Sequence, residues 1–271
     1  MEEEHSLPSA GQHDRVSVPR RLEQWAGENV GTAFVVVLLL CLWEIYSQLF
    51  NDRGDIYFPS IEYTVRQTVE SSGIVLAAIQ VTFVEVLVGF ALAVVLGTTL
   101  GIIIAESFVV RYLSMPALIY TYGIPHPILA PVFLLWFGLG LEGVVTFAAW
   151  VAFFPTFINT VSSLSRIDPE YEKFRTIVGA GRFQHLRYIK FWTALPDIIN
   201  GVKITFQLTI VGAIIAEFLG GGSGLGYLII QSTQRAQLGL TFGIIILIAL
   251  FASVLFKLLS LLLDAFAPHK T

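Results

Sequence analysis

Ionisable and amide side chains inside long apolar segments are the residues of this 271-residue sequence that could do chemistry. Lys203, Gln207 and Glu217 fall at offsets of 0, 4 and 14, close to one face of a helix. His126 stands between two prolines, and Glu85 lies in an earlier apolar run. Polar groups within a bilayer are costly and are typical of the path of a solute or ion. The pattern predicts a translocation pathway lined by His126, Lys203, Gln207 and Glu217.

Three of these residues, Lys203, Glu217 and Glu85, also have a purely structural interpretation. Lys203 and Glu217 would lie roughly 21 Å apart, at about 1.5 Å per helical residue, so they cannot pair with each other. Lys203 can instead extend its ammonium group to the cytoplasmic interface. Glu217 precedes a glycine-rich loop and can be a partner for backbone groups there, and Glu85 can be buried against a neighbouring helix. The charges have mixed signs, so they do not identify an anionic substrate.

The residue patterns of common enzymes and metal sites are missing from the sequence. Gly138, Gly140 and Gly143 match a dinucleotide-binding glycine pattern, but they join two apolar segments instead of following a strand, which favours a tight turn. The loop 220–226 is not followed by the Lys-Ser/Thr pair of a phosphate-binding loop. The histidines lack metal-ligand spacing, and Cys41 is the only cysteine. We expect neither an enzyme nor a bound cofactor or metal.

The composition indicates which elements must carry these residues. Hydrophobic residues make up 55% of the chain and charged residues 13%, whereas globular domains carry about 25% charged residues. This excludes a soluble enzyme, a disordered chain and a collagen-like fibre. The net charge of -4 comes with no basic face, so no nucleic-acid partner is expected. The sequence predicts an all-α, polytopic protein whose partner is membrane lipid.

Six apolar stretches read as helical spans, since a helix needs about 20 apolar residues to cross the hydrocarbon core. The third contains four prolines, which are tolerated in lipid only where protein or a water-lined cavity surrounds them, so we expect it to be interior. The second is longer than one crossing needs and should tilt or extend outside. The predicted spans are 31–50, 74–105, 112–139, 144–161, 196–219 and 238–263.

The segments outside these spans suggest a simple organisation. Residues 1–30 are polar, are not followed by a signal-peptide cleavage site and are expected to form a cytoplasmic tail ahead of a transmembrane domain at 31–268. Residues 59–71 could form a short interfacial helix. An even number of spans places both termini on one side, and Lys and Arg in short loops favour the cytoplasm. The basic residues on the side of the termini outnumber Arg53, Arg66 and Arg235 on the other, which predicts cytoplasmic termini.

The longest of the predicted cytoplasmic connections, residues 162–195, has a helix–glycine–helix pattern. Residues 169–178 are charged and compatible with a helix, Gly179-Ala180-Gly181 interrupts them, and residues 182–192 are amphipathic. Such an element can insert into a groove of a partner protein. It can equally rest on lipid headgroups as an interfacial helix. Composition alone leaves both interpretations open.

The spacing of Gly179-Ala180, Ile189 and Ala194-Leu195-Pro196 resembles the "EAA" loop of permease subunits in ATP-binding-cassette importers. The resemblance continues through GVKITFQLTIVGAIIAEFLGGGSGLGYLI at 201–229. It extends upstream through IPHPILAPVFLLWFGLG at 124–140 and the FFP of 153–155. Together these segments fall within roughly the last two-thirds of the chain. The match is closest to the branch that imports nitrate, taurine, other sulfonates and thiamine-precursor pyrimidines.

The resemblance implies a six-span permease subunit of an ATP-driven importer in the cytoplasmic membrane. It further implies a second permease subunit, two cytoplasmic ATP-binding subunits that hold the ATP, and an external substrate-binding protein. The loop 162–195 would then be the coupling element, with Phe174 or Ile177 as an apolar anchor. The residues expected to contact the ATPase are Glu172, Phe174, Arg175, Ile177, Gly179, Ala180 and Arg182.

Two departures from the family pattern are present. The Glu-Ala-Ala positions are occupied by Lys173, Phe174 and Arg175, with Glu172 one residue early, and Trp192 replaces the first proline of the closing motif. Two other classes of function compete with the importer. A secondary transporter driven by an ion gradient would also need broken helices and polar groups at mid-membrane. A membrane-embedded enzyme is disfavoured by the missing nucleophile or metal cluster.

Overall fold

The computed structural model describes residues 18–49, 58–166 and 169–266, and the regular elements within these ranges are all helices. The chain divides into two units, Met1–Gly54 and Asp55–Thr271. The first unit contains α1 (Val18–Leu49), a helix of 32 residues that includes most of the first predicted span. Residues 18–30 of the predicted polar tail are thus helical, and Pro19 lies in the first turn, where a missing N–H is tolerated.

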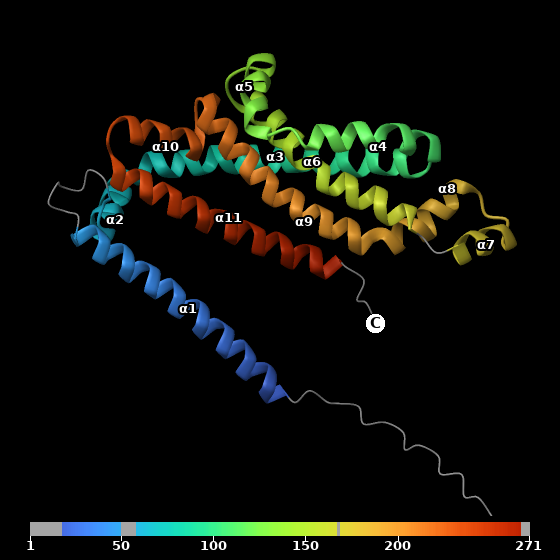
Figure 1. Cartoon of the computed structure of the whole chain (residues 1–271), viewed down its shortest axis with the longest axis horizontal. Helices are drawn as coiled ribbons and strands as arrows, with labels where there is room; N and C mark the ends of the chain where they lie inside the picture. The colour runs from blue at the N-terminus through green and yellow to red at the C-terminus, as the bar shows by residue number, and fades with distance from the viewer. Residues whose placement is uncertain (1–17, 50–57, 167–168, 267–271) are drawn as a thin grey trace, which may run out of the picture. The chain divides into compact units, whose positions relative to one another are not determined.

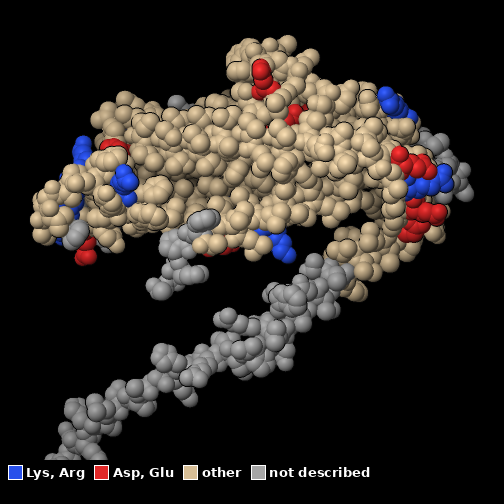
Figure 2. Space-filling view, turned by 180° about the vertical axis from the view of Figure 1, so that it is seen from behind, with Lys and Arg blue, Asp and Glu red and all other residues tan. Residues whose placement is uncertain are grey.

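The helices of the described residues confirm the predicted all-α membrane fold. Four are long and apolar enough to cross a membrane, and two shorter apolar helices accompany them. Figure 2 shows most of the visible charged side chains near the two ends of the second unit, with a largely uncharged stretch between them. This distribution suits a bilayer, where charge is costly in the hydrocarbon core. The four long helices are Ser72–Ala105, Leu141–Ser165, Arg182–Gly221 and Leu238–Ala265.

Helix α6 (Leu141–Ser165) forms the centre of the second unit. It packs against α3 (Ser72–Ala105) on one side and α9 (Phe191–Ala216) on the other (Figure 1). In its most apolar stretch 78% of the residues are buried, against 6% for α11 (Leu238–Phe266). The side chains of α6 therefore make the core, whereas α11 leaves most of its apolar surface for lipid or another protein.

Small residues let α3 and α9 approach α6 closely. A Cβ atom at Gly97 of α3 would lie 2.8 Å from the carbonyl oxygen of Phe153, and one at Gly101 would lie 2.7 Å from Cβ of Thr160. On α9, a Cβ atom at Gly201 would lie 2.9 Å from Cβ of Asn159. Close approach through small residues is the usual way in which membrane helices associate.

A hydroxyl group joins α6 and α9 beside Pro155, the proline of the FFP motif. The Thr205 hydroxyl of α9 donates to the carbonyl oxygen of Ala152 at 2.8 Å and accepts from the Thr156 N–H at 3.2 Å. The hydroxyl oxygen of Thr156 lies 2.8 Å from that of Thr205. Because Pro155 lacks an N–H, neighbouring groups must satisfy the backbone around it, and here the adjacent helix contributes.

The third predicted span is two helices instead of one. Helix α4 covers Phe108–Tyr122 and α5 covers His126–Phe137. The break falls immediately before Pro125, because the residue that precedes a proline is pushed out of the helical region. Pro116 and Pro131 are accommodated inside α4 and α5. Helix α5 packs against α6 and α9 and buries Ala130 and Leu134, whereas no described residue of α4 is buried, so the expected interior position holds for part of α5 and not for α4. In Figure 1, the far end of α5 projects beyond the long helices.

The predicted cytoplasmic loop forms α7 (Pro169–Ile177) and α8 (Arg182–His185), joined by a turn around Gly179. A π-helical turn, η2 (Leu186–Lys190), connects α8 to α9 without interruption. The apolar helix that contains the fifth predicted span therefore runs from Arg182 to Gly221, beginning well before the predicted start at residue 196. The second half of the loop and the membrane helix are one continuous element.

The glycine-rich segment leads into a helix that the sequence analysis did not identify. After the π-helical turn η3 (Glu217–Gly221), α10 (Gly224–Gln234) packs against α3 and α11. Helix α2 (Ile61–Glu70), within the predicted interfacial segment, packs against α11. Figure 1 places α2 and α10 at the end of the unit opposite to α7 and α8.

Candidate functional site

The predicted pathway residues do not form one cluster but lie at different levels along α6. The ring of His126, the first residue of α5, lies 6.5 Å from the ring of Phe154 on α6, edge to face. Near Glu217, a Cβ atom at Gly221 would lie 2.9 Å from Val144 at the start of α6. Val144 and Phe154 are about 15 Å apart along a helix at 1.5 Å per residue. The polar groups thus follow the length of the unit.

Lys203, midway along α9, is held by an ion pair. Its Nζ atom donates to Oδ1 of Asp264 on α11 at 2.6 Å, and the Ser260 hydroxyl donates to the other oxygen of Asp264 at 3.1 Å. The pair ties α9 to α11. Gln207, one turn further along α9, is exposed. The roles of Lys203 and Gln207 in a pathway remain predictions.

Glu217 is fully buried and fastens the glycine-rich segment. Its carboxylate accepts hydrogen bonds from the Thr82 hydroxyl of α3 and from the backbone N–H of Gly226, both at 2.6 Å. The Thr82 hydroxyl in turn accepts from the N–H of Leu225 at 2.9 Å. A Cβ atom at Gly224 would lie 2.2 Å from Cδ of Glu217, so only glycine fits there. Glu217 is therefore a hydrogen-bond partner for a backbone group of the glycine-rich segment, as the structural interpretation of this residue predicted.

Glu85 lies one turn after Thr82 on α3 and is also fully buried. Its carboxyl group faces that of Glu217. Burial of Glu85 against a neighbouring helix was the structural interpretation, and nothing in the sequence brings the two glutamates together. Their separation in the chain hides the contact, because only the packing of η3 on α3 brings them to the same level.

The turn between α7 and α8 explains the glycine at 179. Gly179 has a φ of +66°, a left-handed conformation that disfavours larger residues. Its N–H donates to the carbonyl of Thr176 at 3.3 Å, and the N–H of Ala180 donates to that of Arg175 at 3.1 Å. These two bonds are those of a Schellman motif, which ends a helix with glycine in the left-handed position. Among the described residues, no group lies within 4 Å of the position that a Cβ atom at Gly179 would take.

Exposed apolar side chains surround this turn. Ile177, one of the predicted anchors, is 82% exposed, and Phe183 on α8 is 71% exposed. Phe183 was not among the predicted contacts, although the amphipathic pattern of 182–192 could have indicated it. Arg182 is exposed beside it. The side chains of Glu172 and Phe174 lie outside the described residues.

The base of the same loop is anchored to α3. Nζ of Lys190 lies 3.0 Å from Oε1 of Glu106, the residue that ends α3, and both side chains are largely shielded. His185 on α8 is buried. A displacement of α7 and α8 would therefore be transmitted to α9 through a continuous helix and to α3 through an ion pair.

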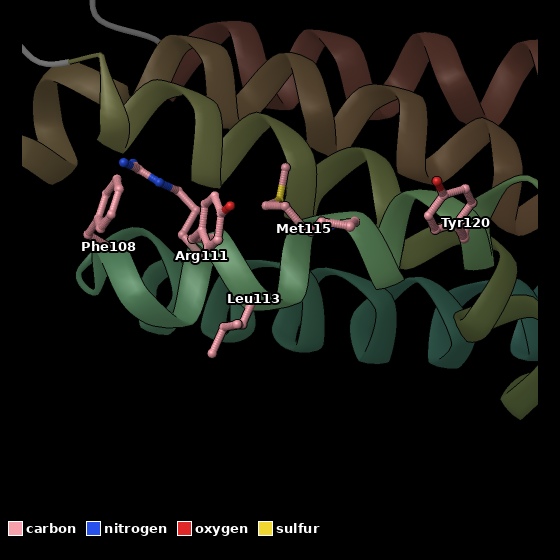
Figure 3. Close-up of a pocket in the computed structure, with 7 residues that line it drawn as sticks. Phe108, Arg111, Leu113, Met115 and Tyr120 are labelled. Atoms are coloured by element: carbon pink, nitrogen blue, oxygen red, sulfur yellow. The ribbon is translucent and has the colours of Figure 1, made fainter.

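A hollow of about 830 Å³ lies along α4 and was not identified from the sequence. Its lining includes Arg111, Met115 and Tyr120 (Figure 3). The guanidinium of Arg111 lies 5.8 Å from the ring centre of Phe108 and donates to the Ser165 hydroxyl at the end of α6. Figure 3 shows Leu113 pointing away from the neighbouring helices, whereas Met115 points towards them. Aromatic and arginine side chains of this kind suit the edge of a membrane.

Comparison with known proteins places the chain among transport components. A family model described as "Binding-protein-dependent transport system inner membrane component" matches residues 97–271. The chain is 30% identical over 193 residues to the formylaminopyrimidine transport permease protein ThiX of Halalkalibacterium halodurans, covering 70% of this chain and 76% of that protein. It is 29% identical over 178 residues to the putative aliphatic sulfonates transport permease protein SsuC of Bacillus subtilis, covering 66% and 64%.

The fold is also similar to that of a solved transporter. A chain from an inward-facing structure of the MetNI methionine ABC transporter superposes with a TM-score of 0.62 at 16% sequence identity. The superposition covers 73% of this chain and 96% of that one. At this identity the likeness supports the arrangement of the helices alone.

Proposed function

The chain belongs to the family of inner-membrane components of binding-protein-dependent transport systems, and from this premise we propose how its helices couple ATP hydrolysis to import. It is a permease subunit of an ATP-driven importer and not an enzyme. Its partners include an ATPase and a substrate-binding protein. The family and the residues that carry the EAA-loop resemblance therefore agree, and the secondary transporter is the alternative to be tested.

The coupling element of this proposal is the surface around the α7–α8 turn. Ile177 and Phe183 supply apolar area, and Arg182 supplies charge at the rim. An apolar anchor with a polar border is the usual form of a short helical element that docks into a groove. Glu172, Phe174, Arg175, Gly179 and Ala180 complete the proposed contact.

The observation that carries the proposal is the helix that runs without interruption from Arg182 to Leu219 and ends at a kink at Gly220. One end of this helix belongs to the exposed loop and the other holds the Glu217 network. Rigid helices transmit displacements along their axes, so movement of a docked ATPase would shift α9 against α6. The ion pair between Lys190 and Glu106 would move α3 in the same step.

The proposed orientation places α7 and α8 in the cytoplasm, together with both termini. Arg111, Arg166, Arg182 and Lys190 belong to elements at this end, and basic residues are retained on the cytoplasmic side. The ATPase is on the same side because ATP is. The opposite end, with α2 and α10, would then meet the substrate-binding protein.

We further propose that the pathway forms between two permease subunits. The apolar surface left by α11 and by much of α3 is available for lipid and for a second copy. His126, Lys203, Gln207 and Glu217 remain the proposed pathway residues. The substrate is drawn from the compounds named for the relatives, with a formylaminopyrimidine first, an aliphatic sulfonate second and nitrate, named for a relative that is 26% identical over 145 residues, third.

A reconstituted complex tests this function. The permease, its ATPase and its substrate-binding protein would be placed in liposomes, and uptake of each of the three compounds would be measured with ATP inside the liposomes. Uptake should require ATP and the binding protein and should persist when ionophores collapse ion gradients. Uptake that follows an imposed ion gradient without ATP would support the secondary transporter instead. An ATPase variant that cannot hydrolyse ATP is the control.

A further inference from the structure

The two buried glutamates beside the glycine-rich segment, Glu85 and Glu217, differ in the hydrogen-bond donors that reach them. Glu217 accepts two short hydrogen bonds, from Thr82 and from Gly226. Within the described residues, neither carboxyl oxygen of Glu85 has a hydrogen-bond partner, although both oxygens are fully buried. Since buried polar groups are nearly always paired, this asymmetry requires an explanation.

Two ionised carboxylates in contact cannot provide that explanation. The Glu85 carboxyl is within hydrogen-bonding reach of the Glu217 carboxyl. Carboxylates only accept hydrogen bonds, so neither could donate to the other. Their like charges would repel strongly in a medium of low dielectric constant. The groups that act on them are each other, Thr82 and a backbone N–H, and no cation of the described chain lies against the pair.

We propose that Glu85 and Glu217 form a proton-binding site, with the proton on Glu85. The carboxyl that receives donors is stabilised as an anion, whereas a carboxyl that receives none is stabilised as the neutral acid. Neutral Glu85 then donates its O–H to Glu217, so both carboxyl groups have a partner. The single negative charge on Glu217 is stabilised by three donors, namely Glu85, Thr82 and the N–H of Gly226. This inference is independent of the substrate and of the ATPase contacts.

The bound proton has a structural consequence for the end of the second unit that holds α10 and the glycine-rich segment. Glu85 and Thr82 belong to α3, whereas Glu217, Leu225 and Gly226 belong to the segment that joins α9 to α10. Three hydrogen bonds would therefore hold this segment against α3, and one of them exists only while Glu85 is protonated. A hollow of about 530 Å³ is lined by Glu85 with Gln80 and Ser223, which gives water a space from which a proton can be exchanged.

A pair of matched variants separates this proposal from a simple requirement for two carboxylates. In Glu85→Gln the amide N–H replaces the acid O–H as a donor to Glu217, so the assembled complex should keep its melting temperature and its uptake. In Glu217→Gln an acceptor oxygen is replaced by an NH₂ group that faces donors from Thr82 or Gly226. The melting temperature should fall by about 2–4 °C or more, the shift expected for a chain of this size from the loss of a buried hydrogen bond.

Infrared spectroscopy of the complex in nanodiscs detects the proton directly. The C=O stretch of a protonated carboxylic acid should be present in the wild type, absent in Glu85→Gln, and unchanged in the control Glu142→Gln, where the residue is exposed. If the band survives in Glu85→Gln, the proposal is wrong. The proposal is equally wrong if the wild type lacks the band and sodium ions raise its melting temperature but not that of Glu85→Gln. A metal cation would then occupy the site in place of the proton. The infrared comparison remains decisive if Glu217→Gln fails to assemble.

Discussion

Single residues of this permease acquire their roles from backbone conformation as much as from their side chains. Gly179 is needed because its φ of +66° ends α7 and starts the turn into α8. Nothing in its surroundings excludes a side chain sterically within the single chain. If a residue that tolerates this φ angle is still excluded because of its size, the exclusion must come from a partner protein. Substitutions at this one position therefore test the coupling proposal.

Replacing Gly179 with tryptophan should abolish ATPase docking without affecting the membrane helices. The bulky side chain would stand on the surface that we propose enters the groove of the ATPase, so the ATPase should no longer co-purify and ATP-dependent uptake should be lost. Gly179→Asn is the matched variant, because asparagine tolerates the left-handed conformation and is small. The Gly179→Asn permease should co-purify with most of the ATPase that the wild type recovers.

The alternative for this loop makes the opposite prediction. A helix that rests on lipid headgroups accommodates tryptophan well. Full recovery of the ATPase with Gly179→Trp, together with normal uptake, would show that the loop is not the coupling element. Insertion and assembly of each variant, followed by size-exclusion chromatography, control for misfolding.

Cysteine accessibility tests the proposed pathway at His126 and Gln207. With Cys41 replaced first, cysteines at these positions should react with charged, water-soluble thiol reagents, and the rates should change when ATP is trapped on the ATPase. A cysteine at Leu250 serves as the control, since this residue of α11 is 57% exposed on an apolar surface and lipid should exclude a charged reagent there. Protection of His126 and Gln207 positions in every state would remove them from the pathway.

At the scale of elements, the molecule depends on how closely α3 and α9 approach α6. Gly97 and Gly101 on α3 face backbone and β-carbons of α6, which cannot move aside as the end of a flexible side chain can. Membrane helices gain little from burial of apolar area relative to lipid, so close packing and interhelical hydrogen bonds such as that of Thr205 must hold them together.

Gly97→Leu should therefore separate α3 from α6. Its Cβ atom alone would lie 2.8 Å from the carbonyl oxygen of Phe153, and overpacking of this kind costs about 1–3 kcal/mol. The purified protein should unfold at a lower temperature, and the change can be measured by thermal denaturation in detergent. Gly73→Leu is the matched control on the same helix, because nothing lies within 4 Å of its Cβ position. Equal stability of the two variants would contradict the packing described for α3.

At the scale of the whole molecule, the second unit has two chemically distinct ends. One end holds α7, α8 and the ion pair of Lys190 with Glu106, which joins η2 to the end of α3. The other end holds α2, α10 and the glycine-rich segment with its buried carboxyl groups. An importer needs this polarity, since ATP is hydrolysed on one side and the substrate arrives on the other.

Labelling from the two sides of intact cells should reveal the orientation. A single cysteine at Ile177 should react only after the membrane is made permeable to a charged reagent, because α7 is proposed to be cytoplasmic. A single cysteine at Arg235, at the end of α10 and exposed, should react from outside. Reversed labelling would place the loop outside and would contradict the use of Lys and Arg to assign its side.

The sequence by itself determined that this is an all-α membrane protein, that it resembles a permease, and where its loop turns. These conclusions rest on local signals, namely runs of apolar residues, the asymmetry of Lys and Arg, and the spacing around Gly179. The prolines of the third span were visible in the sequence, but a single span was predicted there, whereas the structure has two helices, α4 and α5. The helix α10 was missed because glycines at its start suggested a loop.

Only the tertiary structure decided which polar residues meet. Glu85 and Glu217 are 132 positions apart in the chain, and the partner of Lys203 is Asp264 at the far end of α11. Periodicity assigns a residue to a face of its own helix, but it does not say which helix covers that face or at what height. That information arises from the close packing of α3 and α9 on α6, where glycines and a threonine hydroxyl fix the register between helices far apart in the sequence.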